Sequence, residues 1–300
     1  MKPAWSVIFF TVSSGAGLGL MFWLALARMF HAAAPSNTWW WSLGLAVVLF
    51  VAGLLSSTAH LANPKNAWRA FSRFGSSWLS REGVFAIALL VALAAWTLSL
   101  LQAGPGMQRL SGTLVMVLAF AVLFCTGKIY ACLKTIPRWH NWQTVVAYPA
   151  LGLFSGAVLL TALTPPAAAP VIRWLAIVAL IIAAIAKLTL YRAHTTRKGL
   201  DGGDALQVQG GVPRLLDVGH TNPSFLTREF GFELSEHAAR WRRRLVVLLC
   251  FIEPAIVLVF VPDLAWLAVV SLVVGLFIER WLFFAEAQHV VRLYHGAQRV

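Results

Sequence analysis

The chain has 300 residues, of which 59% are hydrophobic and only 12% are charged, and its formal net charge is +13. Soluble globular domains have about 25% charged residues, so this composition excludes a soluble fold and indicates a polytopic membrane protein. The positive charge suits an anionic lipid surface. Because the basic residues are spread over several links, they do not form the basic domain of a nucleic-acid-binding protein.

Eight apolar runs follow one another along the chain, and each has about the 20 residues that a membrane-spanning helix needs. The first run is too long for a cleaved signal, so we expect a retained first span. The predicted fold is an all-α bundle of eight transmembrane helices, a single membrane domain over residues 1–300. The spans are expected at about 5–29, 39–62, 82–103, 110–133, 143–163, 171–191, 243–261 and 265–288.

The distribution of Lys and Arg predicts how the bundle is oriented. An even number of spans puts both termini on one face, and that face carries 21 of the 24 basic residues. The opposite face has Arg28, Arg109 and Arg173. By the positive-inside rule, both termini and the long loop 192–242 are cytoplasmic, in a cell inner membrane. The length of this loop predicts a docking surface for a soluble subunit, extending to the basic run Arg240–Arg244.

The link between spans two and three concentrates groups that suit quinone chemistry. It contains His60, Trp68, Arg69, Trp78 and Glu82 at one membrane interface. A quinone that accepts two electrons also takes up two protons, and histidine and a partly buried glutamate can exchange protons near neutral pH. The tryptophans are suited to stack on the ring. The alternative is an aromatic belt with snorkelling arginines, which needs no ligand.

A second link on the same face repeats this pattern between spans four and five. Tyr130 is a candidate hydrogen-bond donor to a quinone carbonyl, and Lys134 with His140 is expected to line the same cavity. Interfacial anchoring explains these residues as well, and for this link it is the preferred interpretation.

The late spans contain ionisable residues, which are costly inside a membrane unless they are paired or functional. Glu279 and Arg280 are neighbours in sequence and point about 100° apart on a helix. We therefore expect Arg280 to pair with Glu253 on the preceding span, as a structural ion pair rather than a proton path. Glu286 and His289 are expected near the end of the last span, facing a partner subunit.

Metal and haem sites are not expected. Cys125, Cys132 and Cys250 form no CxxC pair, so they do not supply a zinc or iron–sulfur motif. None of the eight histidines lies in the middle of a span, where a b-type haem takes its ligands. Any redox cluster must therefore belong to another subunit, and no residue of this chain is expected to be catalytic beyond a quinone site.

Three segments resemble the membrane anchor subunits of the dimethyl sulfoxide reductase family. They are His60-Leu-Ala-Asn-Pro64 continued through Ser-Ser-Trp-Leu-Ser-Arg-Glu82-Gly, then Lys128 to Asn141, then Glu279-Arg-Trp-Leu-Phe-Phe to His295-Gly. The eight-span layout is similar too. The resemblance implies an anchor without its own prosthetic group, which exchanges electrons between a quinone, menaquinone or ubiquinone, and an iron–sulfur subunit that serves a molybdopterin catalytic subunit.

The resemblance also assigns residues, with two departures. The quinol-site histidine of the family matches His60, and its acid matches Glu82. Ala62 stands where the family often has glycine, and Asn66 stands where a basic residue is common, which leaves the role of the displaced Arg69 open.

Several functions remain open at this point. The cytoplasmic His60 face favours a quinone-reducing anchor similar to that of cytoplasmic sulfite dehydrogenase. The alternative within the family is a quinol-oxidising anchor of a dimethyl sulfoxide reductase in an anaerobic electron transfer chain. A passive anchor without a quinone site is a third possibility. A secondary transporter is a further alternative, although the halves show no clear inverted repeat and the polar residues cluster at one interface.

Overall fold

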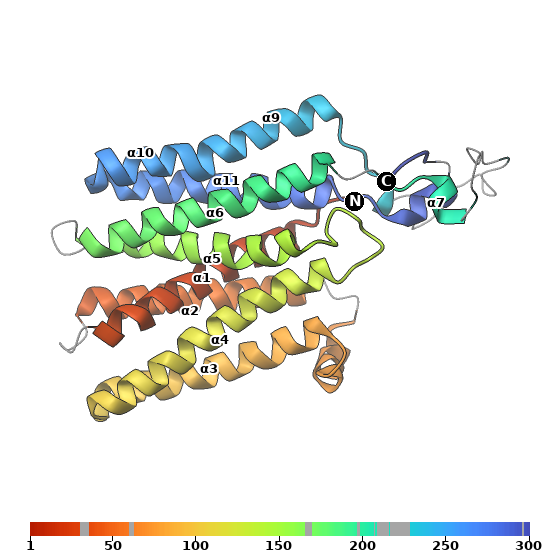
Figure 1. The fold of residues 1–300 in the computed structure, drawn as a ribbon. Coiled ribbons are helices and arrows are strands. Elements are labelled where there is room, and N and C mark those ends of the chain that lie inside the picture. The colour runs from red at the N-terminus through yellow and green to blue at the C-terminus, as the bar shows by residue number, and fades with distance from the viewer. Residues whose placement is uncertain are drawn as a thin grey trace.

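The computed structural model describes residues 1–30, 36–59, 63–165, 170–196, 199–206, 208, 216, 229–295 and 297–300. The predicted all-α bundle is confirmed (Figure 1). His60 lies outside the described residues. Within the described residues, seven helical segments are each long and apolar enough to cross a membrane. They are α1 (Trp5–Phe30), α2 (Asn37–Thr58), α3 (Trp78–Gln102), α4 (Pro105–Ala131), α5 (Trp142–Leu163), α6 (Pro170–Thr196) and α11 (Ala265–Ala285), the last with the short 3₁₀ helix η4 (Pro262–Leu264) before it.

The predicted span 243–261 is built from three consecutive helical pieces, each too short to cross a membrane alone. They are α9 (Glu236–Val247), the π-helix η3 (Leu248–Ile252) and α10 (Glu253–Phe260). The wider π-helical turn and Pro254 interrupt the regular bonding ladder. Ser271 of α11 stabilises this interruption by donating a hydrogen bond to the Leu249 carbonyl at 2.9 Å. This pass, the seventh in chain order, is therefore present as an interrupted helix.

Two predicted helix starts move because of local N-terminal signals. Ser77 caps α3 by accepting a hydrogen bond from the Ser80 amide at 3.3 Å, so the helix starts at Trp78 rather than at Glu82. Pro105 occupies the first turn of α4, where its missing N–H costs nothing. As a consequence, Glu82 lies inside a membrane-spanning helix and not at its start.

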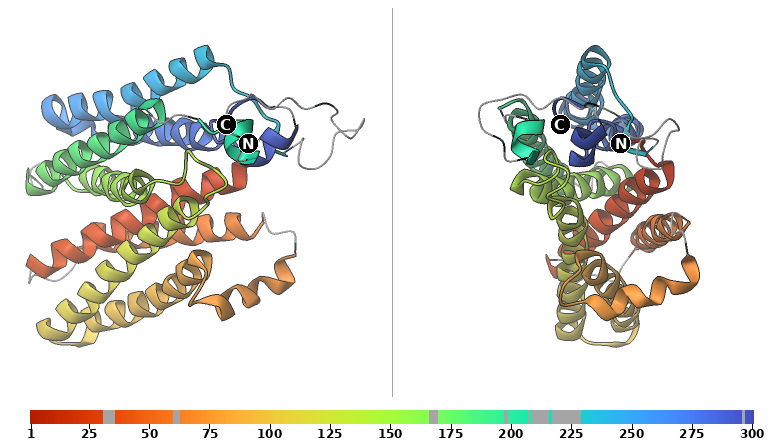
Figure 2. Two further views of the ribbon diagram at one scale, coloured as in Figure 1. Left: turned by 45° about the vertical axis from the view of Figure 1, so that its right-hand side comes forward. Right: turned by 90° about the vertical axis from the view of Figure 1, so that its right-hand side faces the viewer.

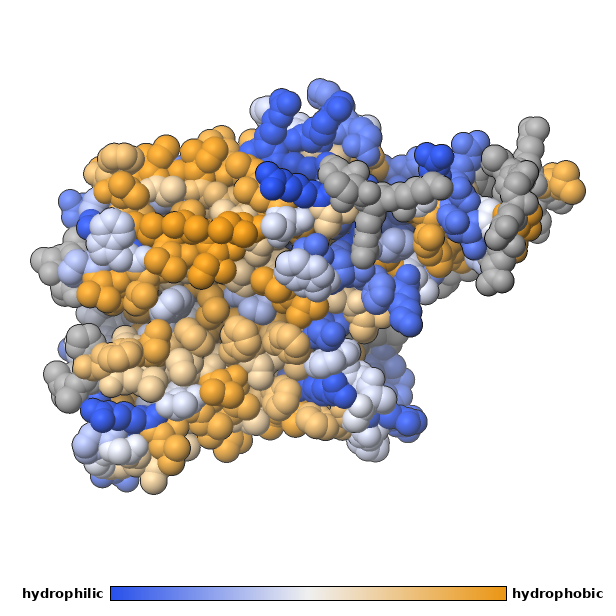
Figure 3. Space-filling model, in the orientation of Figure 1, coloured by the Kyte–Doolittle hydropathy of each residue, from blue (hydrophilic) through white to orange (hydrophobic). Residues whose placement is uncertain are grey.

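Both termini lie at one end of the bundle, called here the terminal end (Figures 1 and 2). The same end holds the 3₁₀ helix η1 (Pro64–Arg73), the link 132–141, the short helix α7 (Gly202–Leu206) and the 3₁₀ helix η5 (Val290–His295). The described junctions between α3 and α4 and between α10 and α11 lie at the opposite end (Figure 1). Figure 3 shows one face of the molecule, on which hydrophobic side chains cover the middle of the helices and most hydrophilic side chains lie toward the terminal end. The predicted placement of both termini on one face is thus confirmed.

Helices α1 and α5 form the centre of the bundle, and each contacts α4 and α11. Both carry glycines at i, i+4 spacing: Gly15 and Gly19 on α1, Gly152 and Gly156 on α5. A Cβ atom on Gly19 would lie 1.9 Å from the Gly152 carbonyl oxygen, and one on Gly156 would lie 2.1 Å from the Gly19 carbonyl carbon. This close backbone approach is the small-residue packing typical of membrane helices.

Candidate functional site

Glu82 is a carboxyl group buried at the terminal end of the membrane domain. It is only 5% exposed and lies in the second turn of α3. The Thr126 hydroxyl, on α4, donates a hydrogen bond to Glu82 Oε1. The same hydroxyl lies 3.0 Å from the Val122 carbonyl oxygen. An intramembrane carboxyl with one hydroxyl partner is a candidate functional group, because burial there is costly.

The Thr126 hydroxyl can adapt to the protonation state of Glu82. It has a single hydrogen and two acceptors within reach, Glu82 Oε1 and the Val122 carbonyl. When Glu82 is ionised, Thr126 donates to the carboxylate. When Glu82 is protonated, Glu82 can donate to Thr126, whose own hydrogen then turns to the Val122 carbonyl. The pair therefore stays hydrogen-bonded in both states.

Aromatic and basic side chains gather around the first turns of α3, beside Glu82 in the sequence. The Arg81 guanidinium lies 4.2 Å and the Lys128 ammonium 5.1 Å from the centre of the Trp78 ring. Arg81 also donates to the Phe74 carbonyl at 2.9 Å, which fixes the turn between η1 and α3. Phe71 of η1 lies against Gly83, since a Cβ there would be 2.8 Å from its ring. Helix η1 is thus held over the start of α3.

The other predicted site residues fall into two groups. Tyr130 is buried one turn after Thr126 on the same side of α4, and its ring stacks on Tyr148 at 5.2 Å. Trp68 is 65% exposed on η1 with the Arg69 guanidinium 5.7 Å from its ring centre, and Lys134 is exposed in the link 132–141. The structure brings Tyr130 toward the Glu82 site, whereas the roles of Trp68, Arg69 and Lys134 stay predictions.

A buried charge cluster joins α6 and α11, and it differs from the predicted pairing. Glu279 is paired with Lys187 and, at 2.6 Å, with the Arg280 Nε atom. The predicted Arg280–Glu253 pair is wrong, because the long Arg280 side chain curls back to its sequence neighbour. The three side chains are 1–5% exposed. Lys187, expected on the cytoplasmic face, therefore lies inside the bundle, and that face keeps its basic bias without it.

Glu286 at the end of α11 does not face outward as predicted. Its carboxylate is buried and accepts a hydrogen bond from Arg243 Nε at 2.7 Å, and Arg138 Nη1 lies at 3.4 Å. His289 lies just beyond, stacked on Phe230 with ring centres 4.6 Å apart. Burial lowers the pKa of His289, and a neutral ring agrees with its Nδ1 atom accepting from the Val291 amide at 3.0 Å. These contacts close the terminal end of α11.

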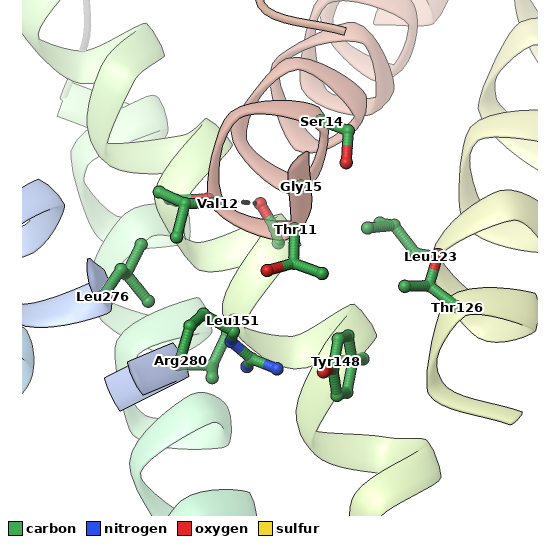
Figure 4. A pocket seen from close by; sticks show the side chains of 12 residues that line it. Thr11, Val12, Ser14, Gly15, Leu123, Thr126, Tyr148, Leu151, Leu276 and Arg280 are labelled. Atoms are coloured by element: carbon green, nitrogen blue, oxygen red, sulfur yellow. Dashed lines mark hydrogen bonds between the residues drawn. The ribbon is translucent and has the colours of Figure 1, made fainter. Parts of the chain in front are cut away.

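A small cavity lies between the Glu82 site and the charge cluster, lined by residues of α1, α4, α5 and α11 (Figure 4). Its volume is about 20 Å³. Thr126 lines one side, and Tyr148 and Arg280 point into it from the other. Tyr148 Oη and Arg280 Nη1 are buried without a hydrogen-bond partner among the described residues.

Thr126, Tyr148 and Lys187 are the residues that the sequence analysis did not single out. Each is a polar residue in an otherwise apolar run, which is the signal that could have identified it. Within the described residues, no group of three or more His, Cys, Asp or Glu side chains could hold a metal ion.

Comparison with known proteins identifies the family. Residues 1–285 match the family described as DMSO reductase anchor subunit (DmsC). The sulfite dehydrogenase C subunit of Allochromatium vinosum is 33% identical over 98% of this chain and 99% of its own length. The anaerobic dimethyl sulfoxide reductase chain YnfH of Escherichia coli is 28% identical over 39% of this chain and 41% of its own length. No solved structure matches this chain.

The apolar multi-pass bundle of the structure agrees with the family match, which covers nearly the whole sequence. The chain belongs to the DMSO reductase anchor subunit (DmsC) family, the membrane anchors of molybdopterin oxidoreductase complexes.

Proposed function

We propose that this anchor exchanges electrons between the membrane quinone pool and an iron–sulfur subunit, which connects it to a molybdopterin catalytic subunit. The observation that carries the proposal is Glu82, a carboxyl group buried in a membrane-spanning helix and hydrogen-bonded by Thr126. Burial of a carboxyl group among apolar residues lowers the stability of the fold, so its presence there indicates a function. Its place at the terminal end, beneath the aromatic and basic residues of the η1–α3 turn, suits a quinone headgroup.

The residues present fit the chemistry that a quinone brings. A quinone takes up two protons with two electrons, and its carbonyl oxygens accept hydrogen bonds. Glu82 holds or releases one proton while Thr126 keeps it hydrogen-bonded in both states. His60 is proposed as the second proton-exchanging group, with Trp68, Arg69, Tyr130 and Lys134 contributing to the site.

Electron flow toward quinone is the favoured direction. This preference rests on the long match to a protein named as the C subunit of a sulfite dehydrogenase and on the basic bias of the terminal end. We infer that both termini are cytoplasmic, in a cell inner membrane, and that menaquinone or ubiquinone is the acceptor. A quinol-oxidising anchor of a dimethyl sulfoxide reductase is the second candidate, supported by the shorter match to YnfH.

The iron–sulfur subunit is proposed to dock on the terminal end. Exposed basic residues mark the start of α9, where His237, Arg240, Trp241 and Arg244 line a surface pocket. Their charge suits an acidic patch on the partner and speeds association at low ionic strength.

Quinone-analogue binding to the purified complex tests the proposal. Fluorescence quenching is measured for wild type, His60→Ala and Glu82→Gln, with the exposed Glu236→Gln as the matched control. We expect binding to be lost in the first two variants while the complex stays assembled, and to be kept in the control. Unchanged binding in both site variants would place the quinone elsewhere, and no binding in wild type would leave a passive anchor.

The direction of electron flow needs a separate assay. The intact complex is supplied either with sulfite and an oxidised quinone analogue or with a reduced analogue and dimethyl sulfoxide. Reaction in the first mixture supports the sulfite dehydrogenase-like function. Reaction in the second alone overturns it in favour of the reductase.

A further inference from the structure

We propose that the cavity between Thr126, Tyr148 and Arg280 binds a water molecule, and that this water is the route by which Glu82 exchanges its proton. The site lies inside the bundle, on the side of Glu82 away from η1. For its functional meaning the inference rests on the proposed quinone chemistry at Glu82. The water site itself rests on the cavity and its lining.

The size of the cavity and the polar groups of Thr126, Tyr148 and Arg280 in its mostly apolar lining suit one water molecule. A volume of about 20 Å³ exceeds the roughly 10–15 Å³ that a single water needs, and buried waters make about 2–4 hydrogen bonds to protein groups. Tyr148 and Arg280 line the cavity, and the Arg280 guanidinium lies 3.9 Å from the centre of the Tyr148 ring. Tyr148 Oη and Arg280 Nη1 are buried without a hydrogen-bond partner among the described residues. Buried polar atoms without a hydrogen bond are costly, and a bound water offsets that cost.

The charges around the cavity fix the orientation of this water. Arg280 can only donate, so the water oxygen accepts from Nη1. The water hydrogens then point away from the guanidinium, toward the acceptors that line the opposite side. One of these acceptors is Thr126 Oγ1, which still has a lone pair while it donates to Glu82. The water thus connects Arg280 to Glu82 through one hydroxyl group.

A proton reaches Glu82 along this hydrogen-bonded route in two coupled transfers. The water gives a proton to Thr126 Oγ1 as the Thr126 hydroxyl gives its own proton to the Glu82 carboxylate. The hydroxide that remains exchanges for a solvent water, which refills the cavity, so the proton comes in the end from the bulk solvent. The reverse sequence releases a proton from Glu82. In heavy water the Thr126 hydroxyl exchanges its hydrogen with the cavity water while Glu82 is ionised, so repeated transfers replace the hydrogen on Glu82 with deuterium.

A route past η1 is the competing possibility. Phe71 covers Gly83, the residue next to Glu82, and a shift of Phe71 would let solvent reach the carboxyl directly. The two routes use different residues, so substitutions separate them. Thr126→Val keeps the shape of the side chain and removes the hydroxyl, while Thr126→Ser keeps the hydroxyl.

The test is hydrogen–deuterium exchange of the Glu82 carboxyl, followed by infrared spectroscopy on the full chain without quinone. The carboxylic acid band is assigned by its loss in Glu82→Gln. We expect Thr126→Val and Tyr148→Phe to slow exchange by about tenfold or more, as loss of one hydrogen bond of about 1.4 kcal/mol in the route predicts. Thr126→Ser is expected to exchange at the wild-type rate.

Two outcomes count against the inference. A wild-type exchange rate in Thr126→Val, or no carboxylic acid band at any pH at which the protein is folded, overturns it. If Thr126→Val does not fold, Phe71→Ala decides: faster exchange in that variant supports the surface route, and an unchanged rate supports the inner one. Because quinone is absent, these results are independent of whether the quinone proposal holds.

Discussion

Among the described residues, Glu279 is the anion that pairs with two buried cations, Lys187 and Arg280. Its removal is predicted to be the most damaging single change in the charge cluster. Glu279→Gln leaves Lys187 and Arg280 uncompensated, although both are at most 5% exposed. Breaking a buried ion pair by removing one partner costs about 3–5 kcal/mol. Such a loss is a large part of a total stability of about 5–15 kcal/mol.

Two further variants test whether the uncompensated charge causes this loss of stability. Lys187→Met leaves a neutral Glu279–Arg280 pair, and we expect a cost below about 1.5 kcal/mol, because apolar replacement of a buried charge is often tolerated. The double variant Lys187→Met/Glu279→Gln leaves one cation instead of two. It is therefore expected to recover at least about 1 kcal/mol relative to Glu279→Gln alone, as a coupled pair does.

Unfolding of the purified protein by sodium dodecyl sulfate, followed by tryptophan fluorescence, measures this order. Lys134→Met is the control, since Lys134 is exposed and should change the stability by less than about 0.5 kcal/mol. If Lys187→Met destabilises the protein as much as Glu279→Gln, or if the double variant is the least stable of the three, the charge argument is refuted.

Three further predictions concern helix packing, a hydrogen bond between helices and a buried ion pair. Gly156→Leu is expected to prevent accumulation of folded protein, because α5 contacts the α1 backbone there, while Gly44→Leu, which has open space around it, should accumulate normally on a membrane blot. Ser271→Ala should lower the free energy of unfolding by about 1 kcal/mol, because the Leu249 carbonyl loses its side-chain donor; an unchanged unfolding midpoint would contradict this. Glu286→Gln should cost about 1–3 kcal/mol through its unpaired arginines, and thermal unfolding equal to wild type would count against it.

The bundle could be predicted from the sequence because apolar run length and basic bias are strong, additive signals. They identified every pass of the chain and the shared face of the termini. The interrupted pass was predicted less well. The π-helix η3 accepts a hydrogen bond from the Ser271 hydroxyl of the neighbouring α11. Hydropathy carries no information on a hydrogen bond between two helices.

The candidate site could be predicted only in part, for a related reason. Glu82 was recognisable as an acid at a membrane interface, but Thr126 follows 44 residues later, and no local pattern joins them. Lys187 was misplaced because a lysine near the end of an apolar run is usually a surface charge. Its burial depends on meeting Glu279, which is 92 residues away in sequence.

The depth of the buried polar residues predicts the side on which protons are exchanged. Glu82 lies in the second turn of α3, and Thr126 and Arg280 lie in the last turns of α4 and α11. At 1.5 Å per residue, these positions lie within about 10 Å of the terminal end. Protons that accompany quinone reduction should therefore be taken from the solvent at that end.

Proteoliposomes with a pH-sensitive dye on one side test this prediction, with the orientation of the complex established by protease access to the long loop. We expect the pH change that accompanies turnover to arise on the side of the terminal end. Glu253, whose Oε2 atom is buried without a partner among the described residues, is the one group in α10 from which a path to the opposite end could start. Proton uptake from the opposite side, abolished by Glu253→Gln, would therefore refute the one-sided exchange, whereas an unchanged sidedness in that variant supports it.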